Sequence, residues 1–225
     1  GEANDHTVVF LSGKNPGVVA ANVPETIWNV GGRYPWSAWN GGNKALYIVS
    51  DNAADTSQVI LNGLDENYNP FTYTITLTGT TGVTTPIGFY RLNNAIYLDG
   101  PNANVGTITI KIGSSSGATV GKIDPLMGST AMSIYTVPAG HSAYSYWGDF
   151  SVNKNEGAEM AAMWRFYGAS FISVFATEVY QQHVYTAPPI PGAIPEKTDI
   201  DNIVRFVTSN GTRVYSNQQL LLVCL

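Results

Sequence analysis

Charged side chains are scarce in this sequence. Lys, Arg, Asp and Glu together make up 12% of its 225 residues, whereas about a quarter is usual for soluble domains. Hydrophobic residues account for 44%, so the chain can bury a core and does not belong to the disordered class. A folded chain of this composition must present Ser, Thr, Asn, Gly and Tyr at its surface. Uncharged surfaces of this kind are common where other subunits cover the exterior.

Positive charge is especially sparse. The formal net charge is -5, the pI is about 5.0, and Lys and Arg form no run. A nucleic-acid groove needs clustered cations that release counterions from the phosphates. The sequence therefore predicts no nucleic-acid partner.

The sequence has a single cysteine and no long apolar run. Cys224 is the single cysteine, so an intrachain disulfide and a structural zinc site are both excluded. No apolar run approaches the roughly 18 residues of a membrane-spanning helix, and no apolar signal segment follows Gly1. We expect no membrane partner, no metal and no cofactor, with stability supplied by packing, hydrogen bonds or assembly.

What the sequence does contain is strand patterning. In "TYTITLT", Tyr73, Ile75 and Leu77 alternate with threonines, which predicts a half-buried strand with a threonine face. "GTITIKIG" alternates in the same way, with Ile108, Ile110 and Ile112 expected inward. The second half continues with strand-like segments, although "AEMAAMWRFYG" also favours helix. "NKNEG" and "NGT" are predicted hairpin turns, and Ile203, Phe206 and Val214 are predicted interior positions.

Turn signals at this spacing predict an all-β fold. We expect two consecutive antiparallel β-sandwich domains of jelly-roll type, preceded by an extended N-terminal arm. The Gly- and Pro-rich arm covers residues 1–40, the first sandwich 41–122 and the second 123–225. The boundary between the sandwiches falls in the loose segment Ser114–Thr130.

Candidates for catalysis are few. His6, His141 and His183 lie far apart in sequence, and we expect Cys224 to be buried rather than nucleophilic. The pairs Asp65/Glu66 and Asp199/Asp201 are compatible with a glycosidase or a calcium site. Both pairs adjoin turn or proline segments, where aspartate caps backbone amides, and this second interpretation is favoured. The sequence predicts no catalytic residue and no enzyme.

Aromatic residues suggest contact surfaces. Tyrosine is enriched at protein interfaces, and the tryptophans near the N-terminus follow no helical stripe. A stacking platform for sugar rings, made by Tyr144, Tyr146, Trp147, Tyr180 and Tyr185, is the lowest-ranked alternative, below core packing of Tyr144, Tyr146 and Phe150 on one strand face. The predicted interface residues are Trp28, Tyr34, Trp36, Trp39, Tyr144 and Tyr180.

Several segments, in this order along the chain, resemble a family of virion structural proteins from tailed bacteriophages of marine and cyanobacterial hosts. They are "SGKNPG", "ETIWNVGGRYPW", "GLDENYNP", "TVPAGHSAY" and "IPEKTDI". His141 departs from the family pattern, which has lysine after "VPAG". The resemblance implies a β-rich particle component without enzymatic activity. A capsid decoration or cement protein on the head is the first expectation.

This role implies binding to the major capsid protein or other virion subunits, self-association as a dimer or trimer, and a place on the capsid surface after assembly in the host cytoplasm. The alternative is a neck, tail or fibre protein that binds a host glycan or receptor. A hydrolase that acts on host surface polymers ranks last.

Overall fold

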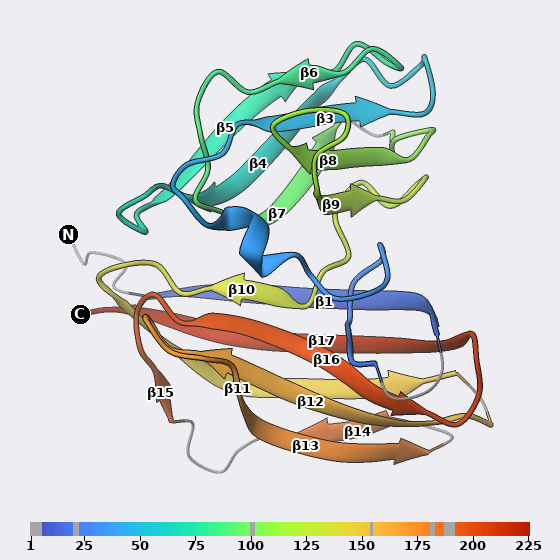
Figure 1. The fold of residues 1–225 in the computed structure, drawn as a ribbon, viewed down its shortest axis with the longest axis vertical. Helices are drawn as coiled ribbons and strands as arrows, with labels where there is room; N and C mark the ends of the chain where they lie inside the picture. The colour runs from blue at the N-terminus through green and yellow to red at the C-terminus, as the bar shows by residue number, and fades with distance from the viewer. Residues whose placement is uncertain (1–5, 20–22, 100–101, 154, 181–182, 187–191) are drawn as a thin grey trace. The chain divides into compact units, whose positions relative to one another are not determined.

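The structure is a computed structural model that describes residues 6–19, 23–99, 102–153, 155–180, 183–186 and 192–225 (Figure 1). Its paired strands are antiparallel, and the all-β prediction is confirmed. The chain divides into two compact units. We call Gly1–Arg33 together with Met132–Leu225 the terminal unit, and Tyr34–Ala131 the inserted unit.

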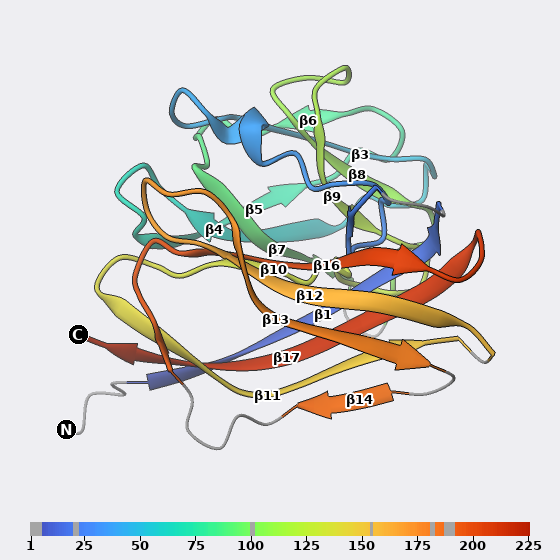
Figure 2. The same cartoon turned by 60° about the horizontal axis from the view of Figure 1, so that its bottom comes forward.

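The terminal unit contains two sheets (Figures 1 and 2). The first has the order β1 (His6–Val18), β17 (Thr212–Cys224), β11 (His141–Val152) and β14 (His183–Thr186), and β15 (Ala193–Ile194) also pairs with β11. The second has the order β10 (Ile134–Thr136), β16 (Asp199–Val207), β12 (Gly157–Arg165) and β13 (Ile172–Tyr180), and β2 (Glu25–Thr26) also pairs with β16.

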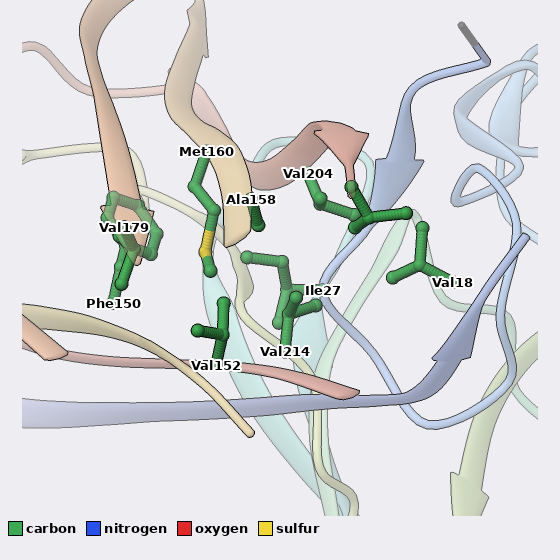
Figure 3. Close-up of a cluster of buried hydrophobic side chains, with 10 residues drawn as sticks. Val18, Ile27, Phe150, Val152, Ala158, Met160, Val179, Val204 and Val214 are labelled. Atoms are coloured by element: carbon green, nitrogen blue, oxygen red, sulfur yellow. The ribbon is translucent and has the colours of Figure 1, made fainter. Parts of the chain in front are cut away.

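The inward faces of these two sheets share two apolar clusters, because alternate residues of each strand point to the same side. Figure 3 shows the first cluster, in which Met160 of β12 points toward Val152 of β11. The second cluster includes Ala143 of β11, Ile200 of β16 and Leu220 of β17. Burial across both sheets is what holds the terminal unit together.

The expected arm over residues 1–40 is corrected in its described part. Thirteen residues of it form β1, which pairs with β17 from His6↔Val223 to Val18↔Thr212. The register shifts between Asn15 and Val18, where Pro16 has no N–H to donate to the ladder. Local sequence could not reveal this strand, because its partner lies about 200 residues away in the chain.

The expected domain limits also differ from the compact units. Residue 123 closes strand β9 (Thr119–Ile123) rather than opening a domain, and the units divide after Arg33 and after Ala131. The segment Trp36–Trp39, expected in the arm, is a 3-10 helix of the inserted unit.

The inserted unit also has two antiparallel sheets. One has the order β6 (Val83–Thr84), β3 (Leu46–Ser50), β8 (Ile108–Ile112) and β9. The other has the order β5 (Pro70–Thr76), β4 (Gln58–Leu64) and β7 (Arg91–Leu98). The predicted threonine face is confirmed, since Thr72, Thr74 and Thr76 of β5 are exposed while the alternate residues are half-buried.

Two predicted hairpins are wrong. The "NKNEG" segment joins β11 to β12 and the "NGT" segment follows β16 and leads into β17, yet each pair of strands lies in different sheets. Turn chemistry reverses the chain direction, but it does not decide which strand becomes the hydrogen-bonded partner. Ile203 and Val214 are buried as predicted, whereas Phe206 is exposed. The ambiguous segment from Ala158 is a strand, since Gly157–Arg165 forms β12.

Candidate functional site

A cavity of about 490 Å³ lies between the inward faces of the two sheets of the terminal unit. We call it the intersheet cavity. From the first sheet it is lined by Ser145, Gly148 and Phe150 of β11 and by Ser216 and Gln218 of β17. From the second sheet it is lined by Ala162 and Trp164 of β12, Phe175 of β13 and Asn202 of β16.

The cavity exists because small residues occupy inward positions in the middle of the strands. Gly148 pairs with Gln218 in the first sheet, and Ala162 pairs with Asn202 in the second. The inward residues further along these strands that belong to the two clusters are apolar, as Figure 3 shows for Val152 and Met160. Glycine and alanine cannot fill the space between sheets, so this level of the core stays open.

The polar residues at this level form a layer between the two apolar clusters. On β17 the inward side chains run Val214, Ser216, Gln218, Leu220 and Leu222, so two polar residues interrupt the apolar series. Val214 belongs to the first cluster, and Leu220 and Leu222 belong to the second. We call Ser133, Ser145, Asn202, Ser216 and Gln218 the polar layer.

Hydrogen bonds connect the polar layer across the two sheets. The Asn202 Nδ2 group donates to Ser133 Oγ at 2.7 Å and to Gln218 Oε1 at 3.1 Å. The Gln218 Nε2 group donates to Ser145 Oγ at 2.8 Å, and Ser133 Oγ lies 3.1 Å from Ser216 Oγ. These bonds offset the desolvation of groups that are expensive to bury alone.

Two polar atoms of cavity-lining residues have no protein hydrogen-bond partner. They are Oδ1 of Asn202, an acceptor, and Nε1–H of Trp164, a donor, and both atoms are buried. More than about nine in ten buried polar groups in proteins are paired with protein or water. Both residues line the cavity, but the two atoms are buried from solvent, so a bound molecule pairs them only if these side chains turn toward it.

The predicted interface residues are dispersed. Trp28, Tyr34, Trp36 and Trp39 are all buried. Within the inserted unit, Trp39 Nε1 donates to the Tyr34 hydroxyl at 3.0 Å, and the rings of Tyr34 and Trp36 meet edge to face at 4.8 Å. These contacts give the three residues a role in packing.

Tyr144 and Tyr180 lie on strands of different sheets. Tyr144 is half-buried on β11, and Tyr180 is exposed at the end of β13. Tyr144 and Phe150 do not share a strand face as expected, because the register shifts between Ser145 and Trp147. A bulge of this kind inverts the alternation on its two sides, so Phe150 is inward and Tyr144 is not. The side chain of Tyr185 lies outside the described residues.

The acidic pairs have structural partners. Asp65 Oδ1 accepts from the backbone N–H groups of Asn67 and Asn69, both at 2.8 Å, as the turn interpretation predicts. Asp199 accepts from Arg165 and from the Thr136 hydroxyl, and Arg33 lies 3.2 Å from Asp201. Among the described residues, no three His, Cys, Asp or Glu side chains are grouped to hold a metal ion.

The expectation that Cys224 is buried is wrong. The residue is exposed rather than buried, and its Sγ lies 3.6 Å from His141 Nε2. The cause is the pairing of β11 with β17, which sets His141 directly opposite Cys224. The two residues are 83 positions apart in the sequence, so local patterns could not predict this contact.

The signal that sequence reasoning missed lies in "RVYSNQQLLLV". Its alternate residues are apolar except for Ser216 and Gln218. Polar residues at buried parity in the middle of a strand indicate either a satisfied polar network or a site. Asn202 also belongs to the polar layer. It follows Asp199 and Asp201, a pair for which the sequence favours a turn interpretation, whereas Asp199–Val207 is strand β16.

Comparisons with known proteins give little. No family model matches the chain, and no curated protein matches it. Among solved structures, the PBSX exported protein XepA has 9% identity and a TM-score of 0.24, over 95% of this chain and 84% of that one. Infectious bursal disease virus, Gx strain, has 10% identity and a TM-score of 0.23, over 97% and 72%. The VP2 subviral particle of that virus has 9% identity and a TM-score of 0.22, over 98% and 72%.

Two of these three structures are viral. TM-scores of this size carry no argument about the fold or role of this chain. Among the described residues, no helix has the length and hydropathy to cross a membrane.

Proposed function

We propose that this protein is a structural component of a tailed-phage virion, namely a decoration or cement protein that binds and stabilises the head shell and has no enzymatic activity. The observation that carries the proposal is the strand order of the terminal unit. One sheet runs β1-β17-β11-β14 and the other β10-β16-β12-β13. The chain changes sheets between β10 and β11, between β11 and β12, and between β16 and β17.

We propose that this order makes the terminal unit an eight-stranded jelly roll, with the inserted unit between its early strands. Jelly rolls are typical of viral capsid proteins, lectins and cupins. Fold alone does not fix function, and it is the ordered sequence segments shared with phage virion proteins that favour the first of these classes. For the inserted unit, we propose a second, smaller sandwich.

Self-association fits the edge strand β13. Ile172, Val174, Phe175 and Tyr180 are all exposed along it, and β13 ends its sheet in the described part of the chain. Exposed apolar edge strands pair readily with another chain. We propose a second copy as that partner, in a dimer or trimer with closed symmetry. The major capsid protein or other virion subunits would then be bound by other surfaces.

Counting copies in purified particles tests this role. Quantitative mass spectrometry should give a number of copies that scales with the major capsid protein, on particles that carry the protein at the capsid surface. A handful of copies per particle would contradict a decoration role and indicate a neck, tail or fibre part.

The second candidate is a neck, tail or fibre protein that binds a host glycan. The intersheet cavity is the specific observation in its favour, because it combines aromatic rings with neutral hydrogen-bonding groups. Host polysaccharide should raise the melting temperature of the purified protein under this proposal, because a ligand that binds only the folded state stabilises it. An unchanged melting temperature would count against it.

A further inference from the structure

We propose that the intersheet cavity binds a neutral saccharide ring. This inference goes beyond the structural role and assigns a site and a ligand class to the second candidate. It concerns the isolated protein, so it stands or falls independently of the number of copies in a particle.

The size of the cavity is the first step. Sites for small molecules have volumes of about 300–1,000 Å³, and this cavity measures about 490 Å³. Protein interiors rarely keep voids larger than a water molecule, because each void loses dispersion contacts. The intersheet cavity lies at the level where Gly148 and Ala162 stand in place of larger residues.

The lining selects the charge of the ligand. Lys, Arg and His are absent from the described lining, and Asp149 is its single carboxylate. The Oδ1 atom of Asp149 already accepts from Asn217 Nδ2 at 2.9 Å. An anionic ligand such as phosphate would find no counter-charge, and a metal ion would find too few oxygen ligands. A neutral molecule fits this lining.

The hydrogen-bonding groups select hydroxyls. Asn202 Oδ1 needs a donor and Trp164 Nε1–H needs an acceptor, and a hydroxyl group supplies both. Leaving such groups unpaired costs about 1–3 kcal/mol each. A ligand that carries several hydroxyls on one rigid ring can pair both groups once the side chains of Asn202 and Trp164 turn them toward the cavity.

Aromatic rings supply the complementary apolar contact. The rings of Phe150 and Phe175 stack with centroids 6.3 Å apart and planes inclined by 13°, and Trp164 lies on the same wall as Phe175. A saccharide ring presents C–H groups on one face and hydroxyls at its edge, which matches a wall of aromatic and amide groups. Val174 and Phe175 line the cavity and are also 38% exposed, so the cavity opens to solvent beside β13.

The experiment is a titration of the full chain with glucose, galactose, mannose and N-acetylglucosamine, followed by saturation-transfer NMR and calorimetry. At least one sugar should bind with a dissociation constant of about 10 mM or tighter, while inorganic phosphate should not bind. Trp164→Phe keeps an aromatic ring but removes the N–H donor, and we expect it to weaken binding about tenfold.

Trp147→Phe is the matched control, because Trp147 does not line the cavity, and its affinity should equal that of the unchanged protein. Ala162→Leu narrows the cavity without removing a polar group, and it should weaken binding even if Trp164→Phe fails to fold. Binding of none of the four sugars, which indicates ordered water as the occupant, would overturn the proposal. So would tighter binding of phosphate, or sugar affinity that Ala162→Leu leaves unchanged.

Discussion

The inserted and terminal units are both made of two antiparallel sheets, but their interiors differ. In the inserted unit the buried apolar positions of strands β3 and β8 are Leu46, Ile48, Ile108 and Ile110, all fully buried; the buried polar strand residues Ser50 and Arg91 lie at strand ends. The terminal unit places the polar layer and a cavity between two apolar clusters. A polar layer gives up hydrophobic stabilisation, so its presence in one unit alone indicates a use other than packing.

Buried polar groups are also present in the inserted unit, but they serve the backbone. Asp55 is fully buried, and its carboxylate accepts from the N–H groups of Val105 and Gly106 at 2.7 and 2.9 Å and from the Ser50 hydroxyl. Asn104 likewise bonds backbone groups, among them Gly106 O and Gly128 N. These side chains fix loops at strand ends. Both carboxylate oxygens of Asp55 and both the Nδ2 and Oδ1 atoms of Asn104 have partners. Asn202 is also buried, but its Oδ1 atom has no partner. Whether a buried polar atom is hydrogen-bonded, rather than how deeply it is buried, therefore distinguishes a structural group from a candidate site.

The largest effect is expected from truncating the apolar core of the inserted unit. Ile110→Ala should lower the free energy of unfolding by about 2–5 kcal/mol, because the well-packed neighbours cannot close the space. Urea unfolding, with hydrogen exchange to locate the effect in residues 34–131, measures it. Ile112→Ala is the control on the same strand, and its loss should be smaller because Ile112 is only half-buried. Equal losses of unfolding free energy in the two variants would show that the neighbours of Ile110 are not tightly packed.

Asp55→Ala comes next. The substitution leaves the Val105 and Gly106 N–H groups without their acceptor, and we expect a loss of about 3 kcal/mol. Asp51→Ala is the matched control, because Asp51 accepts a single backbone bond, from Thr107 N, at an exposed position. Thermal unfolding of both variants tests the difference, and a loss for Asp51→Ala as large as that for Asp55→Ala would contradict it.

Sequence patterns predicted local structure better than partners. The alternation in Thr72–Thr76 and the inward Ile108 and Ile110 follow from side-chain period and β-propensity, and both agree with the structure. Pairing of β1 with β17 could not be predicted in this way, because hydrogen bonds to a strand some 200 residues away leave no local trace.

The candidate site illustrates the same limit. Ser216, Gln218 and Asn202 are ordinary polar residues in the sequence, and they become a site only when β16 and β17 face each other across the core. Composition had pointed to aromatic residues near the N-terminus instead, and these are buried. Bulges add to the difficulty, because the shift between Ser145 and Trp147 changes which residues of β11 point inward.

Adding two methyl groups to one residue of each interior sharpens the comparison. Ala95 of β7 is fully buried in the inserted unit, so Ala95→Val should lower the free energy of unfolding by about 1–3 kcal/mol through overpacking. Ala162 lines the intersheet cavity. Ala162→Val should raise the free energy of unfolding by less than about 1 kcal/mol, because the added methyl groups are removed from water. Chemical unfolding of the pair measures this contrast. Similar losses for both would mean that the cavity is not open to an added group.

Alkaline pH provides the smallest and most selective test, because it acts on one buried hydroxyl of the terminal unit. Burial raises the pKa of the Tyr135 side chain well above its ordinary value of about 10. The folded state therefore holds this proton more tightly than the unfolded state does. The contribution of Tyr135 to stability is complete below about pH 10, and above that pH it is lost by at most about 1.4 kcal/mol per pH unit.

Tyr135→Phe should remove this alkaline slope, while Tyr180→Phe, at an exposed position on β13, should leave it in place. Unfolding free energies measured from pH 8 to pH 11 compare the three proteins. An identical slope in all of them would mean that Tyr135 reaches water when the protein is folded. Tyr135 belongs to the second apolar cluster, which borders the polar layer. Loss of the slope in Tyr135→Phe alone would then show that water does not reach this cluster, although the polar layer adjoins it.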